Sequence, residues 1–343
     1  MAYSTIDKPT DYFNTVLYTG NGGSQNITGV GFSPDWVWLK GRNNANNHNL
    51  NDTVRGVNKQ LYADINNAET TATTHLTAFD SDGFTLGNDG AVNGSSDTYV
   101  SWNWKAGGSA SSNSNGSITS SVSANTTAGF SIVTYTGNGT AGATVGHGLG
   151  SIPKGIIVKV RNTTNEWVVY HTSLGATKFI EMNSTGAVQT NTTRFNDTEP
   201  TSSVFSLGTA AGLNTSSDTH VAYCFAEKKG YSKFGSYTGN GNADGTFVYT
   251  GFRPAWVMVK RTDSGNSWCI FDNKRPGFNE TNQYLLAEDS RAELTDMGFE
   301  ILSNGFKLRQ TFNSVNGSGA SYIYLAFAES PFVNSNGVPN NAR

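Results

Sequence analysis

The sequence predicts an all-β protein built from three tandem β-sandwich modules of jelly-roll or lectin-like type. Three observations lead to this fold class. The pentapeptide YTGNG occurs three times, beginning at Tyr18, Tyr135 and Tyr237. A set of short apolar runs returns in the same order after each copy. Gly, Asn, Ser and Thr are abundant, and all four are poor helix formers that favour turns and strand edges.

The last strand of each module shows the repeat most clearly. The segments TYVSWNWKA, THVAYCFAE and SYIYLAFAE align without a gap. Apolar residues on every second position share one face of a strand. That face comprises Val100, Trp102 and Trp104, then Val221, Tyr223 and Phe225, then Ile323, Leu325 and Phe327. We expect each module to bury this face between two packed antiparallel sheets.

The remaining strands follow in chain order. A Gly-apolar-Pro landmark precedes the apolar runs DWVWLKGRN, KGIIVKVRN and AWVMVKRTD, and a second run appears as NNHNLND, NEWVVYH and NSWCIFD. SDGFTL and SNGFKL predict hairpins in the first and third modules, because Asp-Gly or Asn-Gly between alternating apolar residues is a strong hairpin signal. The second module has SSVFSL and no such glycine. Residues 284–296 come nearest to a helical period, so we expect a short helix there.

Composition shifts place the module boundaries. Module 1 covers residues 1–108 and includes an N-terminal arm, residues 109–128 form a Gly/Ser-rich flexible linker, module 2 covers 129–230, and module 3 covers 231–343 with a C-terminal tail. YTGNG then indicates fold punctuation rather than a ligand cradle. Its Tyr ends an incoming strand, and Gly-Asn-Gly tolerates the positive φ of a turn.

Charge and targeting signals exclude several classes of partner. The formal net charge is −3 and Lys/Arg runs are missing, so nucleic acid is not expected as a partner. No apolar stretch approaches the roughly 18 residues of a membrane span, so membrane insertion is not expected. The N-terminus lacks the pattern of a secretory signal. Cys224 and Cys269 do not make a disulfide framework, and their slots in the repeat indicate packing residues.

No catalytic, cofactor-binding or metal-ligating set emerges from the motifs. The histidines are dispersed, DSDG at Asp80 to Gly83 is followed by a strand instead of further calcium ligands, and no pair of carboxylates or nucleophile elbow is recognisable. We therefore expect no enzyme activity, no cofactor and no bound metal.

One polar pair repeats and provides the candidate ligand residues. Asp52 and Arg55 reappear as Asp272 and Arg275, whereas module 2 has His171 and Leu174 in their places. A carboxylate and a guanidinium three residues apart most often satisfy each other as an internal ion pair. Alternatively they line a polar pocket for sugar hydroxyls. The ligand candidates are His48, Asp52, Arg55, Asp272 and Arg275.

The residues also carry a family resemblance. DYFNTVLYTGNG, GFSPDWVWLKGRN, DTVRGVNKQLY, FDSDGFTLG and YVSWNWKAGG resemble a repeat common in marine tailed bacteriophages, and the C-terminal AESPFVNSNGVPNNAR resembles the end of the same proteins. The likeness is close in module 1, good in module 3 and looser in module 2. Such proteins are described as tail fibres, head appendages or other virion components. No residue role can be carried over from them.

The resemblance implies a non-enzymatic virion surface protein, a tail fibre or appendage assembled in the infected bacterial cytoplasm. We expect it to form a homo-oligomer, a trimer, that contacts host-surface glycans and other virion proteins. One alternative is a capsid decoration or structural connector that docks through its N-terminal arm. A second alternative is a polysaccharide depolymerase.

Overall fold

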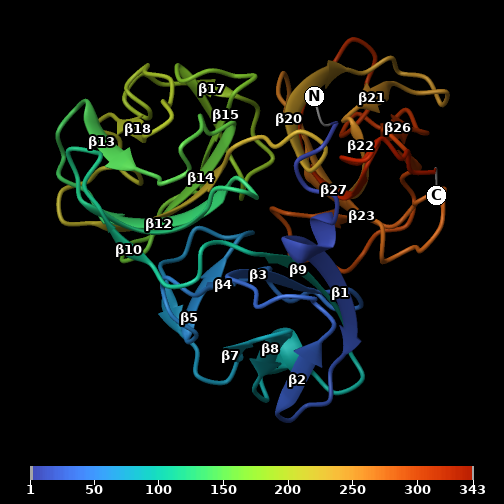
Figure 1. Ribbon diagram of the computed structural model, residues 1–343, viewed down its shortest axis with the longest axis horizontal. Coiled ribbons are helices and arrows are strands. Elements are labelled where there is room, and N and C mark those ends of the chain that lie inside the picture. Colours follow the sequence, from blue (N-terminus) through green and yellow to red (C-terminus); the bar gives the residue numbers. More distant parts are fainter. Residues whose placement is uncertain (1–2, 342–343) are drawn as a thin grey trace.

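The computed structural model describes residues 3–341 as an all-β protein of antiparallel sheets (Figure 1). Each module pairs one large sheet with one small sheet, as multiple β-sandwich modules would. The modules do not follow one another like beads on a string. They surround a common centre, with module 1 at the bottom of the view and modules 2 and 3 at the upper left and upper right (Figure 1).

Module 1 has a large sheet in the order β1-β9-β3-β4-β5-β6 and a small sheet in the order β2-β8-β7. The 3-10 helix η1 (Pro9–Asp11) precedes the first strand, and α1 (Gly90–Asn93) precedes the last one. The expected hairpin at Asp-Gly is confirmed, because β7 and β8 pair up to Asp80 and Gly83. The strands are β1 (Phe13–Thr19), β2 (Gln25–Thr28), β3 (Trp36–Gly41), β4 (Asn49–Asp52), β5 (Lys59–Tyr62), β6 (Thr70–Thr71), β7 (Leu76–Asp80), β8 (Gly83–Leu86) and β9 (Thr98–Trp104).

Module 2 has a large sheet in the order β10-β11-β12-β19-β14-β15-β16-β17 and a small sheet of β13 and β18. Its first two strands lie in residues 109–128, which we expected to be a flexible linker. The Ser-rich β11 pairs along β12, so neighbouring backbone overrides the linker composition. The strands are β10 (Ser111–Asn113), β11 (Ser120–Asn125), β12 (Phe130–Thr136), β13 (Ala143–Gly146), β14 (Gly155–Val160), β15 (Val168–His171), β16 (Lys178–Glu181), β17 (Gln189–Thr190), β18 (Val204–Leu207) and β19 (Thr219–Phe225).

Module 3 has a large sheet in the order β20-β27-β22-β23-β24 and a small sheet in the order β21-β26-β25. The helix expected over residues 284–296 is wrong. Tyr284 and Leu294 instead form an antiparallel bridge, and β24 joins the large sheet. The strands are β20 (Ser232–Thr238), β21 (Phe247–Tyr249), β22 (Phe252–Arg261), β23 (Trp268–Asp272), β24 (Leu285–Leu286), β25 (Phe299–Leu302), β26 (Gly305–Leu308) and β27 (Ser321–Pro331).

The aromatic face of each last strand is buried, but not where we expected it. Trp102, Tyr223 and Leu325 do not lie between the two sheets of their own modules; all three belong to one central cluster shared by the three modules. The alternate residues of the same strands fill the separate module cores. Cys224 packs in the core of module 2 and Ala326 in that of module 3. Each large sheet is therefore covered on both faces, and the three sheets pack against one another at the centre.

The N-terminal arm also contributes to this centre. Ile6 is 3% exposed and belongs to the central cluster, and the Tyr12 ring contacts the Tyr231 ring of module 3 edge to face. The C-terminal tail meets the arm, because the backbone N–H of Ser335 donates to Asp7 at 2.7 Å. Both described chain ends thus lie on module 3 (Figure 1).

YTGNG is confirmed as fold punctuation, and the structure shows its mechanism. The Tyr18 hydroxyl donates to the carbonyl of Val92 at 2.7 Å, while the backbone N–H of Asn21 donates to the side chain of Asn93 at 2.9 Å. The same two bonds recur in module 2 from Tyr135 to Leu213 and from Asn138 to Asn214. In module 3 they run from Tyr237 to Val315 and from Asn240 to Asn316.

A fully buried asparagine is the partner of each pentapeptide. Asn93, Asn214 and Asn316 are each 0% exposed. The Asn214 amide nitrogen donates to the carbonyls of Thr140 and Gly208, at 2.9 and 2.8 Å. Each asparagine therefore ties the YTGNG turn to the loop before the last strand.

We predict that Asn214→Ala lowers the free energy of unfolding by about 2 to 4 kcal/mol, because it leaves several buried backbone groups without a partner. Asn93→Ala and Asn316→Ala should act in the same direction. Denaturant unfolding measures the loss. The exposed Asn115 is the matched control, and Asn115→Ala should stay within about 0.5 kcal/mol of the parent. Equal losses of stability in Asn214→Ala and Asn115→Ala would contradict this structural role of Asn214.

Candidate functional site

The Asp/Arg pairs and His48 lie at the junctions between modules. We name these junction A (modules 1 and 2), junction B (modules 2 and 3) and junction C (modules 3 and 1). At each junction the strand pair β4–β5, or its equivalent, meets the large sheet of the next module. The backbone N–H of Glu69 donates to Arg161 O at 2.6 Å in junction A. The corresponding bonds run from the N–H of Val188 to Thr262 O at 2.9 Å in junction B and from the N–H of Glu293 to Arg42 O at 2.7 Å in junction C. The same backbone contact therefore recurs between all three pairs of modules.

Junction A contains a buried ion pair with a partner from the next module. Arg55 Nε lies 2.5 Å from Asp52 Oδ2, and both side chains are 0% exposed. The hydroxyl of Tyr223 in module 2 donates to the same carboxylate oxygen at 2.8 Å. Glu69 accepts from Arg55 at 3.2 Å and from Arg161 of module 2 at 2.9 Å. Burial opposes ionisation of Glu69, but the two guanidinium groups outweigh it and lower its pKa.

Junction C repeats this chemistry. Arg275 Nε lies 2.6 Å from Asp272 Oδ2, which also accepts from the indole N–H of Trp102 in module 1 at 3.0 Å. Glu293 then bridges Arg275 and Arg42 of module 1, at 3.1 and 2.9 Å. Burial opposes ionisation of Asp272, and Arg275 keeps its pKa below the usual range. The internal ion pair expected from the sequence is therefore confirmed in both places.

Junction B has an apolar version of the same contact. Leu325 of module 3 occupies the place of Tyr223 and Trp102, and it offers no hydrogen-bond donor. Opposite it, module 2 presents His171 and Leu174 in place of Asp and Arg. Nε2 of His171 lies 3.2 Å from the carbonyl of Tyr324. At junction B the carboxylate is replaced by His171, and the hydrogen-bond donor that would face it is replaced by Leu325. This paired replacement explains why module 2 departs from the repeat.

A buried aromatic donor links the modules a second time. The indole N–H of Trp167 in module 2 donates to Tyr62 O of module 1 at 2.7 Å, and that of Trp268 in module 3 donates to Glu181 O of module 2 at 3.0 Å. His48 is the equivalent residue at junction C. Its Nδ1 accepts from Trp38 at 2.8 Å, and burial lowers its pKa well below the usual range.

Three equivalent lysines are buried beside these contacts. Lys40, Lys159 and Lys260 are each 0% exposed, and burial lowers each pKa to about 8. The ammonium of Lys159 donates to Asn66 O of module 1 at 3.2 Å, and that of Lys260 to Thr185 O of module 2 at 3.1 Å. A buried lysine ammonium therefore also links the two modules at junction A and at junction B.

The five ligand candidates are accordingly junction residues. His48, Asp52 and Asp272 are 0% exposed as whole residues, and the side chains of Arg55 and Arg275 are 0% exposed. Their polar atoms contact neighbouring modules, and the polar-pocket alternative gains no support from this geometry.

The other sequence candidates also have structural roles. Cys224 and Cys269 are free and buried, and burial raises both thiol pKa values, so packing is confirmed. Asp80 pairs with Gly83, which confirms the turn between them, and the Asp82 side chain accepts from the backbone N–H groups of Gly29 and Gly31 at 3.1 and 2.6 Å. Within residues 3–341 no three His, Cys, Asp or Glu side chains gather as a metal site would require. In the same residues, no helix has the length and apolar character to cross a membrane.

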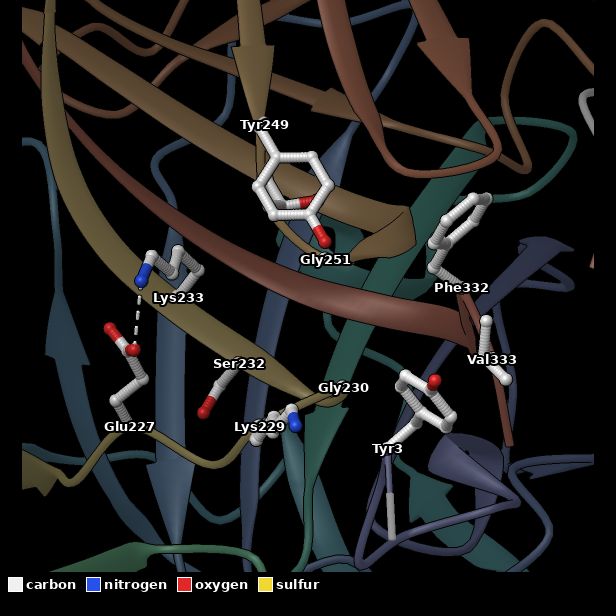
Figure 2. Close-up of a pocket in the computed structure, with 11 residues that line it drawn as sticks. Tyr3, Glu227, Lys229, Gly230, Ser232, Lys233, Tyr249, Gly251, Phe332 and Val333 are labelled. Atoms are coloured by element: carbon white, nitrogen blue, oxygen red, sulfur yellow. Dashed lines mark hydrogen bonds and ion pairs between the residues drawn. The ribbon is translucent and has the colours of Figure 1, made fainter. Parts of the chain in front are cut away.

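A surface pocket on module 3 is the candidate functional site, and sequence reasoning missed it. Its volume is about 180 Å³. Four separate segments build it: the N-terminal arm, the connection 227–233, the end of β21 and the chain after β27. Figure 2 shows Tyr3, Tyr249, Phe332 and Val333 around one side and the Lys233–Glu227 ion pair, 2.9 Å long, on the other.

The rings in this pocket are unusually exposed. Tyr3 is 59% exposed and Tyr249 58%, and the ammonium of Lys229 lies 5.6 Å from the centre of the Tyr3 ring. The backbone beneath Tyr249 is fixed, since the N–H groups of Thr250 and Gly251 both donate to Asn304 O, at 2.9 and 3.1 Å. Gly251 has a φ of +83°, a backbone conformation that favours glycine, and it lies against the Tyr249 ring.

Tyr249 has no aromatic counterpart in the other two modules. Tyr249 pairs with Gly305, and the equivalent pairs are Thr28 with Gly83 and Gly146 with Val204. The neighbouring Phe247, 44% exposed, is likewise replaced by Asn26 and Thr144. Only module 3 places aromatic side chains on the outer face of this strand. Comparing the three repeat copies position by position is the sequence signal that could have found them.

We predict that Arg55→Leu lowers the free energy of unfolding by about 3 to 5 kcal/mol, because it leaves the buried Asp52 carboxylate without its cation. The triple variant Asp52→His, Arg55→Leu, Tyr223→Leu gives junction A the residues of junction B. We expect the triple variant to lose less free energy of unfolding than the three single substitutions lose in total.

Denaturant unfolding of the single and triple variants measures this coupling. The control is Arg291→Leu, because the Arg291–Asp289 pair is half exposed, and its loss should cost under about 1 kcal/mol. If the free-energy losses of the three single substitutions add up to that of the triple variant, the proposed coupling between these three positions is wrong.

We predict a decline in stability as the pH falls from 6.5 towards 4. Burial lowers the pKa of His171 to about 4, so in this window the unfolded chain binds a proton that the folded chain does not. His171→Gln should make the pH dependence shallower, by about 1 to 3 kcal/mol across the window. Unfolding at a series of pH values tests this, and an unchanged slope would place the titration elsewhere.

Comparison with known proteins gives one match. No curated protein and no solved structure matches the chain. A family model described as a domain of unknown function, DUF7483, matches residues 8–331, which include all three modules. The chain belongs to the DUF7483 family.

Proposed function

We propose that this protein is a non-enzymatic virion surface protein of a tailed bacteriophage, a tail fibre or appendage that contacts glycans on the host surface. The sequence resemblance supports the virion assignment. The exposed aromatic pocket on module 3 is the observation that carries the glycan-binding role.

Pocket chemistry suits a carbohydrate. A sugar ring presents C–H groups on its faces and hydroxyls at its edge, so its sites commonly combine an exposed aromatic face with polar groups. Tyr249 and Tyr3 supply both an apolar ring and a hydroxyl. Glu227 and Lys233 lie opposite them and bring an acceptor and a donor. Such shallow sites bind weakly, and we propose that a homo-oligomer carries several of them for avidity.

The strand order supports the finer fold proposal of jelly-roll or lectin-like sandwiches. In each module the strand that carries the YTGNG tyrosine pairs with the last strand of the large sheet: β1 with β9, β12 with β19 and β20 with β27. The chain crosses between the sheets before and after β2.

We predict that the purified full chain, immobilised at high density, binds host envelope preparations through their polysaccharide. Periodate oxidation of the polysaccharide should abolish this binding, whereas protease treatment of the envelopes should preserve it. Surface plasmon resonance measures both effects. No binding at high protein concentration to any host fraction would refute the glycan-contacting role. Release of new reducing ends would refute the non-enzymatic assignment.

A further inference from the structure

We propose that the module 3 pocket binds an acidic sugar unit, a single pyranose bearing a carboxylate. This inference rests on the proposed function and names the ligand class of that site. It follows from three features of the pocket: its size, its one uncompensated charge and the placement of its rings.

The size fits one sugar ring. On the measure by which one water molecule needs about 10 to 15 Å³, the pocket has about 180 Å³, which is room for a small organic ligand. A monosaccharide fills such a space, and the rest of a longer chain would extend over the surface beyond it.

The charge in the pocket is positive and unpaired. Lys233 is neutralised by Glu227, whose other carboxylate oxygen accepts from the backbone N–H of Phe234 at 3.3 Å. Lys229 is exposed, and among residues 3–341 no carboxylate lies within ion-pair distance of its ammonium. A ligand carboxylate beside Lys229 would meet one positive charge without a competing acid.

The rings place the sugar beside that charge. Lys229 lies against the face of Tyr3, an arrangement that holds a lysine ammonium near an aromatic ring. Tyr249 stands across the pocket with its hydroxyl towards Gly251 (Figure 2). A pyranose stacked on Tyr249 would therefore direct one edge towards Lys229. Tyr3, Lys229 and Tyr249 come from different segments of the chain, so only the assembled protein brings them together.

The test uses the full chain and three single variants: Lys229→Ala, Tyr249→Ala and Phe247→Ala. Phe247 is the matched control, because it shares the outer face of β21 with Tyr249 but lies outside the pocket lining. The probes are oligosaccharides of glucuronic acid and the same oligosaccharides with their carboxylates reduced to alcohols. Isothermal titration calorimetry measures the affinity of the parent and of each variant for both probes, at low and at high salt.

We expect the parent to bind the acidic probe at least tenfold more tightly than the reduced one, with weaker binding at high salt. Lys229→Ala should erase this preference, Tyr249→Ala should weaken binding of both probes at least tenfold, and Phe247→Ala should change neither. Equal affinity for both probes overturns the acidic-ligand inference. Binding of host polysaccharide that persists in Tyr249→Ala also overturns it and leaves the proposed function standing. Failure to bind any host fraction refutes both.

Discussion

Burial of both faces of each large sheet is the constraint on which the rest of the structure depends. One face covers the core of its own module, and the other carries the aromatic residues of the central cluster, including Trp36, Trp104 and Trp256. A buried Trp removes about 150 to 250 Å² from water, which contributes several kcal/mol at about 25 cal/mol per Å². A single module would leave that face exposed. The three modules are therefore one folding unit, in agreement with a family model that spans residues 8–331.

The junctions determine how this apolar centre is closed. Aromatic packing alone does not fix how one sheet lies on the next, whereas a buried carboxylate with a cation and a cross-module donor has a single good geometry. Junctions A and C use that device through Asp52 with Tyr223 and Asp272 with Trp102. Junction B combines Leu325 with Leu174 and a His171 whose pKa is about 4. Two junctions are thus held by buried ion pairs, and the third by apolar packing beside a buried histidine.

Sequence periodicity could predict which residues share a face but not what covers that face. Trp102 and Trp104 were correctly placed on one side of a strand, yet alternation cannot distinguish a sandwich core from a neighbouring module. A signal for burial on both sides was present, because the intervening positions in VAYCFA and IYLAFA are also apolar or small. The Ser-rich strand β11 was missed because its pairing with β12 is a tertiary effect. The pairing of Asp52 with Arg55 was local in sequence and could be predicted.

Repeat symmetry also separates architecture from function. Where the surroundings are the same in all three modules, as beside the YTGNG turn, the residue is the same, which is why Asn93, Asn214 and Asn316 are identical. A surface position has no such demand and normally stays polar, as Thr28 does. Tyr249 breaks the repeat by exposing a large ring in water, which burial cannot explain. The same comparison that groups the repeated residues of the fold therefore singles out the outer face of β21, where module 3 alone among the three carries exposed aromatic side chains.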